Sequence, residues 1–336
     1  MPARMSETAS PVPLREHSPV HRDLISVQDF SPEEILGLFK SARLMKDRPV
    51  NFRGALAGKQ IVLFFEKASL RTRLTFESAM ASMGGTSVFV DQTQSHLGER
   101  ETLSDVAHNV ERWVNAVILR TFEHQTVLEV ARHASIPVIN ALSNLEHPCQ
   151  AFADFFTLQE RFGDLRDVHL AYVGDGNNMA HSLMLAAASL GSKITIGCPG
   201  NYAPLEQVTS AALAIAARTG AQISITDDPV AAVRDADAVY TDAWASMGQE
   251  DEAGKRSRIF SPYQVNASLF AHAAPEAIFM HCLPAHRGME VTAEVIDSPQ
   301  SVVFDQAENR MHVQKAILLS LLDGAARRGP SRSNHA

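Results

Sequence analysis

Short β-branched runs alternate with helical patterns along most of this 336-residue chain. Such alternation is typical of parallel sheets, because each crossover between parallel strands is usually made by a helix. We therefore predict an α/β fold of two doubly wound parallel-sheet lobes with helices on both faces and the active site in the cleft at the carboxyl ends of the strands. The strands are predicted at Ile61–Phe65, Thr86–Val90, Ala116–Leu119 and Val138–Ile139 in the first lobe, and at His169–Val173, Lys193–Ile196, Gln222–Ile225, Ala238–Tyr240 and Ile278–Met280 in the second.

The length of the chain allows two domains, each with its own hydrophobic core. A helical run from His147 to about Phe162 is predicted to carry the chain from one lobe to the other. A last helix, near Gln306 to Leu322, follows the final strand and is expected to pack back on the first lobe. The predicted domains are therefore residues 21–152 plus 306–323, and residues 153–305.

Both ends of the chain are predicted to be disordered tails, at residues 1–20 and 324–336. They are rich in small, polar and charged residues, and the first contains no apolar core that could serve as a secretory signal. Arg4, Arg15 and Arg22 leave a mitochondrial presequence as the alternative for the first tail, although Glu7 and Glu16 disfavour it.

The composition excludes several classes of protein. A formal charge of −8 and a pI near 5.9 disfavour a protein whose overall field attracts nucleic acid or anionic membranes. No apolar run reaches the roughly 18 residues that a membrane span needs. Three cysteines argue against a disulfide framework and for a reducing compartment, so we predict a cytoplasmic protein with no nucleic-acid or membrane partner.

The segment Ser69-Leu70-Arg71-Thr72-Arg73 concentrates anion-binding groups where a predicted strand gives way to a helix. Guanidinium groups, hydroxyls and the free N–H groups of a first helical turn can all face one phosphate. Because Arg71 and Arg73 diverge by roughly 200° on a helix, only one of them is expected to touch the ligand. The segment predicts a phosphorylated or acyl-phosphate substrate.

Two further clusters suit a carbonyl group that carries an NH₂. Arg120 closes the apolar strand Val117-Ile118-Leu119 and can polarise a carbonyl oxygen, although a strand-end arginine alone is more often structural. His147 and Gln150 lie three apart at a helix start, therefore on one face. The imidazole can donate to a carbonyl oxygen while the carboxamide oxygen accepts from the NH₂, which fits a carbamoyl group.

The second lobe offers groups for the other substrate. The glycine-rich turn Gly174-Asp175-Gly176-Asn177-Asn178-Met179 fails the dinucleotide fingerprint at its third glycine position, so Asn178 is expected to reach a ligand and no nicotinamide cofactor is expected. Asp242 ends a strand before a long polar loop and suits a substrate ammonium. An ordinary surface loop is the alternative reading of that segment.

The segment from His281 to Gly288 invites two other interpretations, which we disfavour. Zinc sites need three or four ligands at a recognisable spacing, and no second Cys or His pair completes one here, so no metal is expected. Covalent chemistry at Cys282 is unnecessary when an amine attacks an activated carbonyl.

Taken together, these segments resemble the aspartate/ornithine carbamoyltransferase family, most closely its ornithine branch. The similarity extends from about Asp23 to Leu322. The matching segments are Phe65-Glu66-Lys67-Ala68-Ser69-Leu70-Arg71-Thr72-Arg73, Arg120-Thr121-Phe122-Glu123-His124, His147-Pro148-Cys149-Gln150, Gly174-Asp175-Gly176-Asn177-Asn178, Asp242 with Ser246-Met247-Gly248, and His281-Cys282-Leu283-Pro284.

The resemblance implies a carbamoyl-phosphate domain and an ornithine domain in a homotrimer whose active sites lie between subunits. It implies no cofactor and a cis Leu283–Pro284 bond. By family pattern, ornithine contacts Asn178, Asp242, Ser246 and Met247. Carbamoyl phosphate contacts Ser69, Leu70, Arg71, Thr72, Arg120, His147, Gln150, Cys282, Leu283 and Arg310, together with His96 from the neighbouring subunit, where many relatives carry Gln.

The activity that the resemblance implies is transfer of a carbamoyl group to the δ-amine of L-ornithine, giving L-citrulline and phosphate in arginine biosynthesis. Arg71, Arg120, His147, Asp242 and Cys282 are the expected catalytic residues. Acetylornithine, succinylornithine and putrescine stay open as alternative acceptors. A non-catalytic module that binds a phosphorylated metabolite is the rival from another class.

Overall fold

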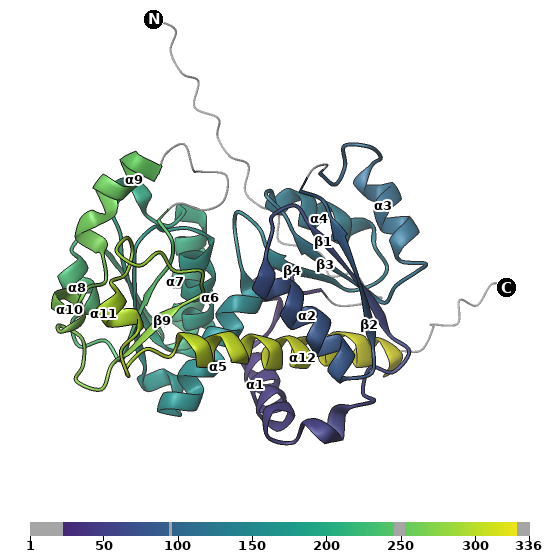
Figure 1. Ribbon diagram of the computed structural model, residues 1–336, viewed down its shortest axis with the longest axis horizontal. Coiled ribbons are helices and arrows are strands. Elements are labelled where there is room, and N and C mark those ends of the chain that lie inside the picture. The colour runs from purple at the N-terminus through teal and green to yellow at the C-terminus, as the bar shows by residue number, and fades with distance from the viewer. Residues whose placement is uncertain (1–22, 94–95, 245–252, 328–336) are drawn as a thin grey trace, which may run out of the picture.

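The computed structural model describes residues 23–93, 96–244 and 253–327 and folds into two lobes, each built on one parallel sheet (Figure 1). The first sheet has the strand order β2-β1-β3-β4 and the second the order β7-β6-β5-β8-β9. Every pairing between these strands is parallel. The predicted fold class is therefore confirmed, with two α/β lobes.

The first lobe contains four strands joined through helices. Its strands are β1 (Gln60–Phe65), β2 (Thr86–Asp91), β3 (Ala116–Arg120) and β4 (Val138–Leu142), and its helices are α1 (Pro32–Asp47), α2 (Leu70–Ser82), α3 (Leu103–Val110) and α4 (His124–His133). Strand β3 is buried at every residue because helices and neighbouring strands cover it on all sides. The strands predicted for this lobe are all present, each lengthened by a few residues at most.

The second lobe repeats the pattern with five strands. Its strands are β5 (His169–Val173), β6 (Lys193–Gly197), β7 (Gln222–Thr226), β8 (Ala238–Thr241) and β9 (Ile278–His281), and its helices are α6 (Asn178–Leu190), α7 (Glu206–Thr219), α8 (Pro229–Val233), α9 (Ala253–Phe260), α10 (Ala267–Phe270) and α11 (Ala293–Ile296). The central strands β5 and β8 are fully buried, whereas the edge strand β7 is largely exposed. All five predicted strands are confirmed.

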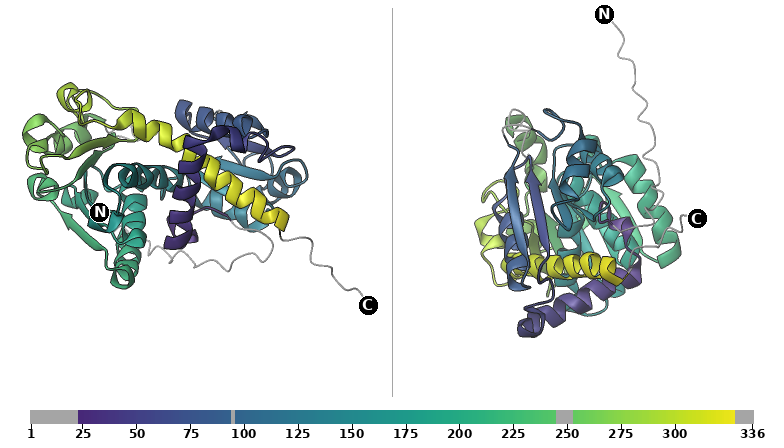
Figure 2. Two further views of the ribbon diagram at one scale, coloured as in Figure 1. Left: turned by 90° about the horizontal axis from the view of Figure 1, so that it is seen from below. Right: turned by 90° about the vertical axis from the view of Figure 1, so that its right-hand side faces the viewer.

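Two helices connect the lobes. Helix α5 (Pro148–Phe162) leads from β4 into the second lobe, as predicted, and its first eleven residues are buried. Helix α12 (Val303–Arg327) runs from the second lobe beneath the first (Figures 1 and 2) and packs against α1, α2 and α5. One hydrophobic cluster runs through these helices and both sheets, so the lobes share a core at their junction.

No helix within the described ranges is both long and apolar enough to cross a membrane.

Candidate active site

A cleft of about 590 Å³ opens between the lobes at the carboxyl ends of both sheets. Open parallel sheets bind ligands at this edge because loops after the strands leave a crevice there. Arg71, Arg120, His147 and Asp242, which the sequence places far apart, line this one cleft. The other predicted residues that line it are Ser69, Leu70, Thr72, Gln150, Asn178, Cys282, Leu283 and Arg310.

The start of α2 forms one wall of the cleft. Ser69 caps the helix, since its Oγ accepts a hydrogen bond from the Thr72 N–H at 3.2 Å. The same hydroxyl donates to Thr72 Oγ1 at 3.0 Å. Arg71 lines the cleft, whereas Arg73 lies over the Phe89 ring, 3.8 Å from its centroid, and outside the lining set. The two arginines diverge as predicted, and Arg71 is the one that lines the cleft; its contact with a ligand stays a prediction.

Three guanidinium groups, those of Arg71, Arg120 and Arg310, line the same cleft. Arg310 donates to Thr72 Oγ1 at 2.8 Å, and Arg120 Nε donates to the Lys67 carbonyl at 3.2 Å. Burial lowers the pKa of Arg71 and of Arg310, and burial together with nearby Arg310 lowers the pKa of Arg120 to about 9. All three stay cationic at neutral pH, and their mutual repulsion favours an anion between them.

Four buried polar atoms on residues that line the cleft lack a partner among the described residues: His147 Nδ1, Gln150 Oε1, Arg310 Nε and Trp244 Nε1. Gln150 Nε2 donates to Asp154 Oδ1 at 2.8 Å, which holds the carboxamide and leaves its oxygen free. Burial, with nearby Arg310 and Arg120, lowers the pKa of His147 well below its usual value, so its imidazole is neutral. Because buried polar groups are almost always paired, these atoms indicate a polar ligand.

The opposite wall carries a carboxylate. Asp242 follows β8, and its Oδ1 accepts from the Cys282 thiol at 3.0 Å and from the Ala243 N–H at 2.8 Å. Asn177 donates to the second oxygen, Oδ2, at 3.2 Å. Burial and the Asp242 charge raise the pKa of Cys282 well above its usual value, so Cys282 is a neutral thiol donor rather than a thiolate nucleophile.

The segment after β9 completes the cleft. Leu283 has a positive φ of 58°, and the peptide bond between Leu283 and Pro284 is cis, as the resemblance implied. The Leu283 N–H donates to His281 Nδ1 at 2.8 Å, and His281 Nε2 lies 3.3 Å from Glu290 Oε1. Buried His281 therefore holds the loop that carries Cys282 and Leu283 against the cleft.

Asp242, His281 and Cys282 each offer one potential metal-ligating atom, and these atoms lie within 4.8 Å of one another. Both ring nitrogens of His281 already bond to protein groups, so a metal ion would have to displace one of those bonds. The expectation of no metal stays a prediction.

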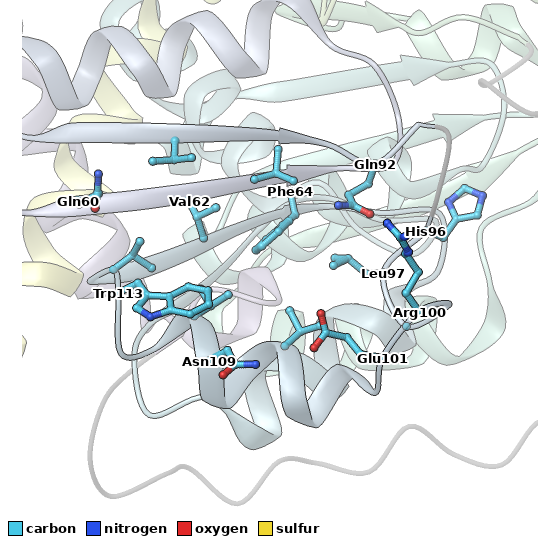
Figure 3. Close-up of a pocket in the computed structure, with 16 residues that line it drawn as sticks. Gln60, Val62, Phe64, Gln92, His96, Leu97, Arg100, Glu101, Asn109 and Trp113 are labelled. Atoms are coloured by element: carbon cyan, nitrogen blue, oxygen red, sulfur yellow. The ribbon is translucent and has the colours of Figure 1, made fainter.

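Two predicted residues are not described by the structure, and one described residue lies away from the cleft. Ser246 and Met247 lie outside the described residues. His96 is half exposed and lines a separate apolar pocket of about 510 Å³, between strands β1 and β2 and helix α3 (Figure 3). Its ring packs edge-on against Phe122, with centroids 5.5 Å apart. Within one copy of the chain, His96 does not join the other predicted residues.

Several residues at the site were missed in the sequence. Lys67 and Trp244 line the cleft without having been given a role, although Lys67 lies within the matching segment Phe65–Arg73 and Trp244 lies between Asp242 and Ser246. Asp154 does not line the cleft but binds Gln150, and its position four residues later on the same helix is the signal that could have revealed it. Lys67 also lies over the Phe122 ring, 4.6 Å from its centroid.

Two sequence profiles of one family together match most of the chain. The profile of the aspartate/ornithine carbamoyltransferase carbamoyl-P binding domain matches residues 22–160, and that of the Asp/Orn binding domain matches residues 166–321. The chain belongs to the aspartate/ornithine carbamoyltransferase family. The break between the matches falls at the end of α5, where the chain enters the second lobe.

Individual members of this family are similar over almost their whole length. The ornithine carbamoyltransferases of Pyrococcus abyssi and Bacillus subtilis are each 48% identical to the chain, over 90% of it and over 96% and 94% of their own lengths. The solved structure of ornithine carbamoyltransferase from Pyrococcus furiosus superposes with a TM-score of 0.87 at 47% identity, covering 92% of this chain and 99% of that one. The resemblance noted in the sequence is therefore confirmed.

Proposed function

We propose that the chain is an enzyme that transfers the carbamoyl group of carbamoyl phosphate to the δ-amine of L-ornithine, giving L-citrulline and phosphate in arginine biosynthesis. One observation carries this proposal. Three guanidinium groups, a neutral imidazole and a free carboxamide oxygen face a carboxylate and a thiol across one cleft. This distribution suits a dianionic acyl phosphate on one side and an amine on the other.

Carbamoyl phosphate is assigned to the side of the cleft built by α2, β3, α5 and α12. Arg71 and Arg310 hold the phosphate, with the N–H groups at the start of α2 and the Ser69 hydroxyl beside them. Leu70 is assigned a contact to carbamoyl phosphate through its backbone, because its side chain is exposed. Gln150 Oε1 accepts from the carbamoyl NH₂, and Cys282 and Leu283 close the pocket over the substrate.

Ornithine is assigned to the second lobe. Asp242 and Asn178 are the described residues for it, and Ser246 and Met247 complete the set by family pattern. The Asp242 carboxylate attracts the substrate's ammonium group and orients the δ-nitrogen toward the carbonyl carbon. The Cys282 thiol fixes that carboxylate through its hydrogen bond to Oδ1.

The reaction is a direct displacement. The neutral δ-amine attacks the carbonyl carbon, the new C–N bond forms, and the C–O bond to phosphate then breaks as the amine's proton passes to the departing phosphate. Arg120 and His147 stabilise the tetrahedral oxyanion. Thr72 Oγ1 already accepts bonds from Ser69 and Arg310, so its own O–H is left to donate to the same oxygen.

The domain boundaries follow from this assignment. Residues 21–152 plus 306–323 are proposed to bind carbamoyl phosphate and residues 153–305 to bind ornithine. The second profile runs on to residue 321, but α12 packs against α1 and α2 and brings Arg310 to Thr72, which supports counting the last helix with the first domain.

We further propose a homotrimer with shared active sites, located in the cytoplasm. His96 is then donated to the neighbouring subunit's cleft, which accounts for its position away from its own cleft beside the apolar pocket in Figure 3. Phe64, Val88 and Trp113 line that pocket, and a second copy would cover them. All three cysteines are free thiols, which supports a reducing compartment.

A colorimetric citrulline assay on the purified chain tests the proposal. Carbamoyl phosphate and L-ornithine should give citrulline and phosphate in equal amounts. Acetylornithine, succinylornithine and putrescine, tested at the same concentration, should give no carbamoylated product. A faster reaction with one of these three would reassign the acceptor, and carbamoyl-phosphate binding without product from any acceptor would favour a non-catalytic binding module.

A further inference from the structure

The first two turns of α6 bind the segment 143–147 that leads into the active-site histidine. Asn178, His181 and Ser182 stand at positions i, i+3 and i+4 of α6 and therefore share one helix face. Asn178 Nδ2 donates to the Ser143 carbonyl at 2.7 Å. His181 Nδ1 donates to the Leu145 carbonyl at 2.8 Å, since its Nε2 accepts from the Leu205 N–H. The second lobe thus holds the last residues before α5.

The third contact is the one nearest the chemistry. Ser182 is completely buried, and its Oγ accepts a hydrogen bond from the His147 N–H at 2.8 Å. The same hydroxyl donates to Glu146 Oε2 at 3.4 Å. Glu146 Oε2 also accepts from the Val27 N–H, at 3.0 Å, so one carboxylate links Ser182 to the first lobe.

The backbone of His147 is bound from both sides, and Ser182 supplies the bond from the second lobe. It is the N-cap of α5, with φ −135° and ψ 66°, and its side chain makes no capping bond. Its N–H precedes the helical ladder and has no helical partner. Neither ring nitrogen of His147 makes a hydrogen bond to a described residue, and Nδ1 is buried without a partner. The ring is therefore held through its backbone. The His147 carbonyl accepts from the Gln150 and Ala151 N–H groups at 3.1 and 3.2 Å, and the His147 N–H, bound by Ser182, joins it to the second lobe.

The start of α6 also contacts the opposite wall of the cleft. Asn177 caps the helix through bonds from the Met179 and Ala180 N–H groups to its Oδ1, and its Nδ2 donates to Asp242. A single helix start therefore joins the amine-side carboxylate to the carbamoyl-side histidine.

We propose that Ser182 is a positioning residue for carbamoyl transfer: its buried hydroxyl ties the His147 peptide and Glu146 to α6 and so sets the His147 imidazole against the carbonyl oxygen. This inference rests on the proposed function. Without the hydroxyl, the buried His147 N–H loses its partner. The Glu146–His147 peptide then keeps only its bonds to the first lobe, such as that from the Ser143 N–H to the Glu146 carbonyl at 2.9 Å, and the ring can shift relative to the substrate. A misplacement of about 1 Å can cost roughly 10²-fold in rate.

The test is a double-mutant cycle on the full-length chain with Ser182→Ala, His147→Ala and the double variant. Ser182→Ala should lower kcat by about tenfold or more while changing KM for ornithine less than threefold. In the His147→Ala background the same change should cost less than about twofold, because no imidazole is left to position. Ser189→Ala is the matched control: Ser189 is a buried serine two turns along the same helix and lies outside the cleft lining.

Two results would overturn the proposal. One is a kcat for Ser182→Ala within twofold of that of the unmodified chain. The other is an equal fold-loss of kcat with and without His147, since a general structural effect does not depend on the imidazole. If Ser182→Ala fails to fold, Ser182→Cys, whose thiol forms weaker hydrogen bonds, carries the same cycle with a smaller expected loss. Citrulline formation by the unmodified chain tests the proposed function separately, so failure of one does not imply failure of the other.

Discussion

Replacing Gln150 by Met should abolish the preference for a substrate that carries an NH₂. The Gln150 side chain is completely buried, Asp154 holds its Nε2 at 2.8 Å, and its Oε1 has no partner within the described residues. In the proposed complex this oxygen accepts from the carbamoyl NH₂. Methionine has nearly the same length and no strong acceptor, so the NH₂ would be buried without a partner.

The size of the effect follows from that loss. Leaving a buried donor unpaired costs about 1–3 kcal/mol, which corresponds to about 5- to 150-fold in binding. Acetyl phosphate has a methyl group in place of the NH₂ and should not suffer this loss. The unmodified chain should therefore favour carbamoyl phosphate over acetyl phosphate by a factor in this range, and Gln150→Met should bring the two close to equality.

The assay compares KM for carbamoyl phosphate with the inhibition constant of acetyl phosphate as a competitor in citrulline formation. Gln159→Met, in the last turn of the same helix and outside the cleft lining, is the matched control and should keep the original ratio. A Gln150→Met enzyme that still discriminates as strongly as the unmodified chain would refute the assignment of Oε1 to the NH₂.

Three further predictions concern charge, pH and assembly. Arg120→Gln should lower kcat by about 10²–10³-fold in the citrulline assay, because it removes a preorganised cation from beside the oxyanion. Arg132→Gln, on the exposed side of α4, is the control and should leave kcat unchanged, and equal rates for the two variants would refute the role of Arg120. Burial, with nearby Asp29, raises the pKa of Glu146 from 4.5 to about 7. The folded state therefore keeps a proton that the unfolded state releases between those pH values, and stability should fall as pH rises from about 4.5 to 7, by at most about 3 kcal/mol from this group. Urea unfolding of Glu146→Gln should show a correspondingly smaller fall, and an unchanged pH profile would contradict the assignment. Finally, His96→Ala subunits and Arg120→Gln subunits should each be nearly inactive alone. When the two are dissociated and reassembled together, activity should return, because some sites then combine Arg120 of a His96→Ala subunit with His96 of a neighbouring Arg120→Gln subunit. No return of activity would count against shared sites.

The sequence predicted the fold and most of the cleft because both follow from local patterns. Alternating strands and helices define parallel sheets, and the carboxyl ends of parallel strands meet at one edge. Arg120, His147 and Asp242 each follow a predicted strand, so their convergence could be expected before any distance was known. The strand-to-helix turn at Ser69 was predicted in the same way, from an apolar strand that gives way to a helix, and the structure adds that Ser69 caps this helix.

The remainder depended on packing that no local pattern encodes. Arg310 reaches Thr72 across 238 residues of sequence because α12 crosses beneath the first lobe, and only the family resemblance suggested it. Glu146 resembles an ordinary exposed charge at a helix start. It is buried because the segment containing Val27 and the helix containing Ser182 converge on it from different lobes.

Binding of a bisubstrate analogue, in which a phosphonoacetyl group is joined to the δ-nitrogen of L-ornithine, tests most directly whether the two half-sites share one cleft. Titration calorimetry should show that the analogue binds at least about 10²-fold more tightly than either half alone, because one molecule then contacts both walls of the cleft. Arg120→Gln and Asp242→Asn should each weaken it. The shared cleft would be contradicted if the analogue bound no more tightly than its phosphonate half and if Asp242→Asn did not weaken its binding.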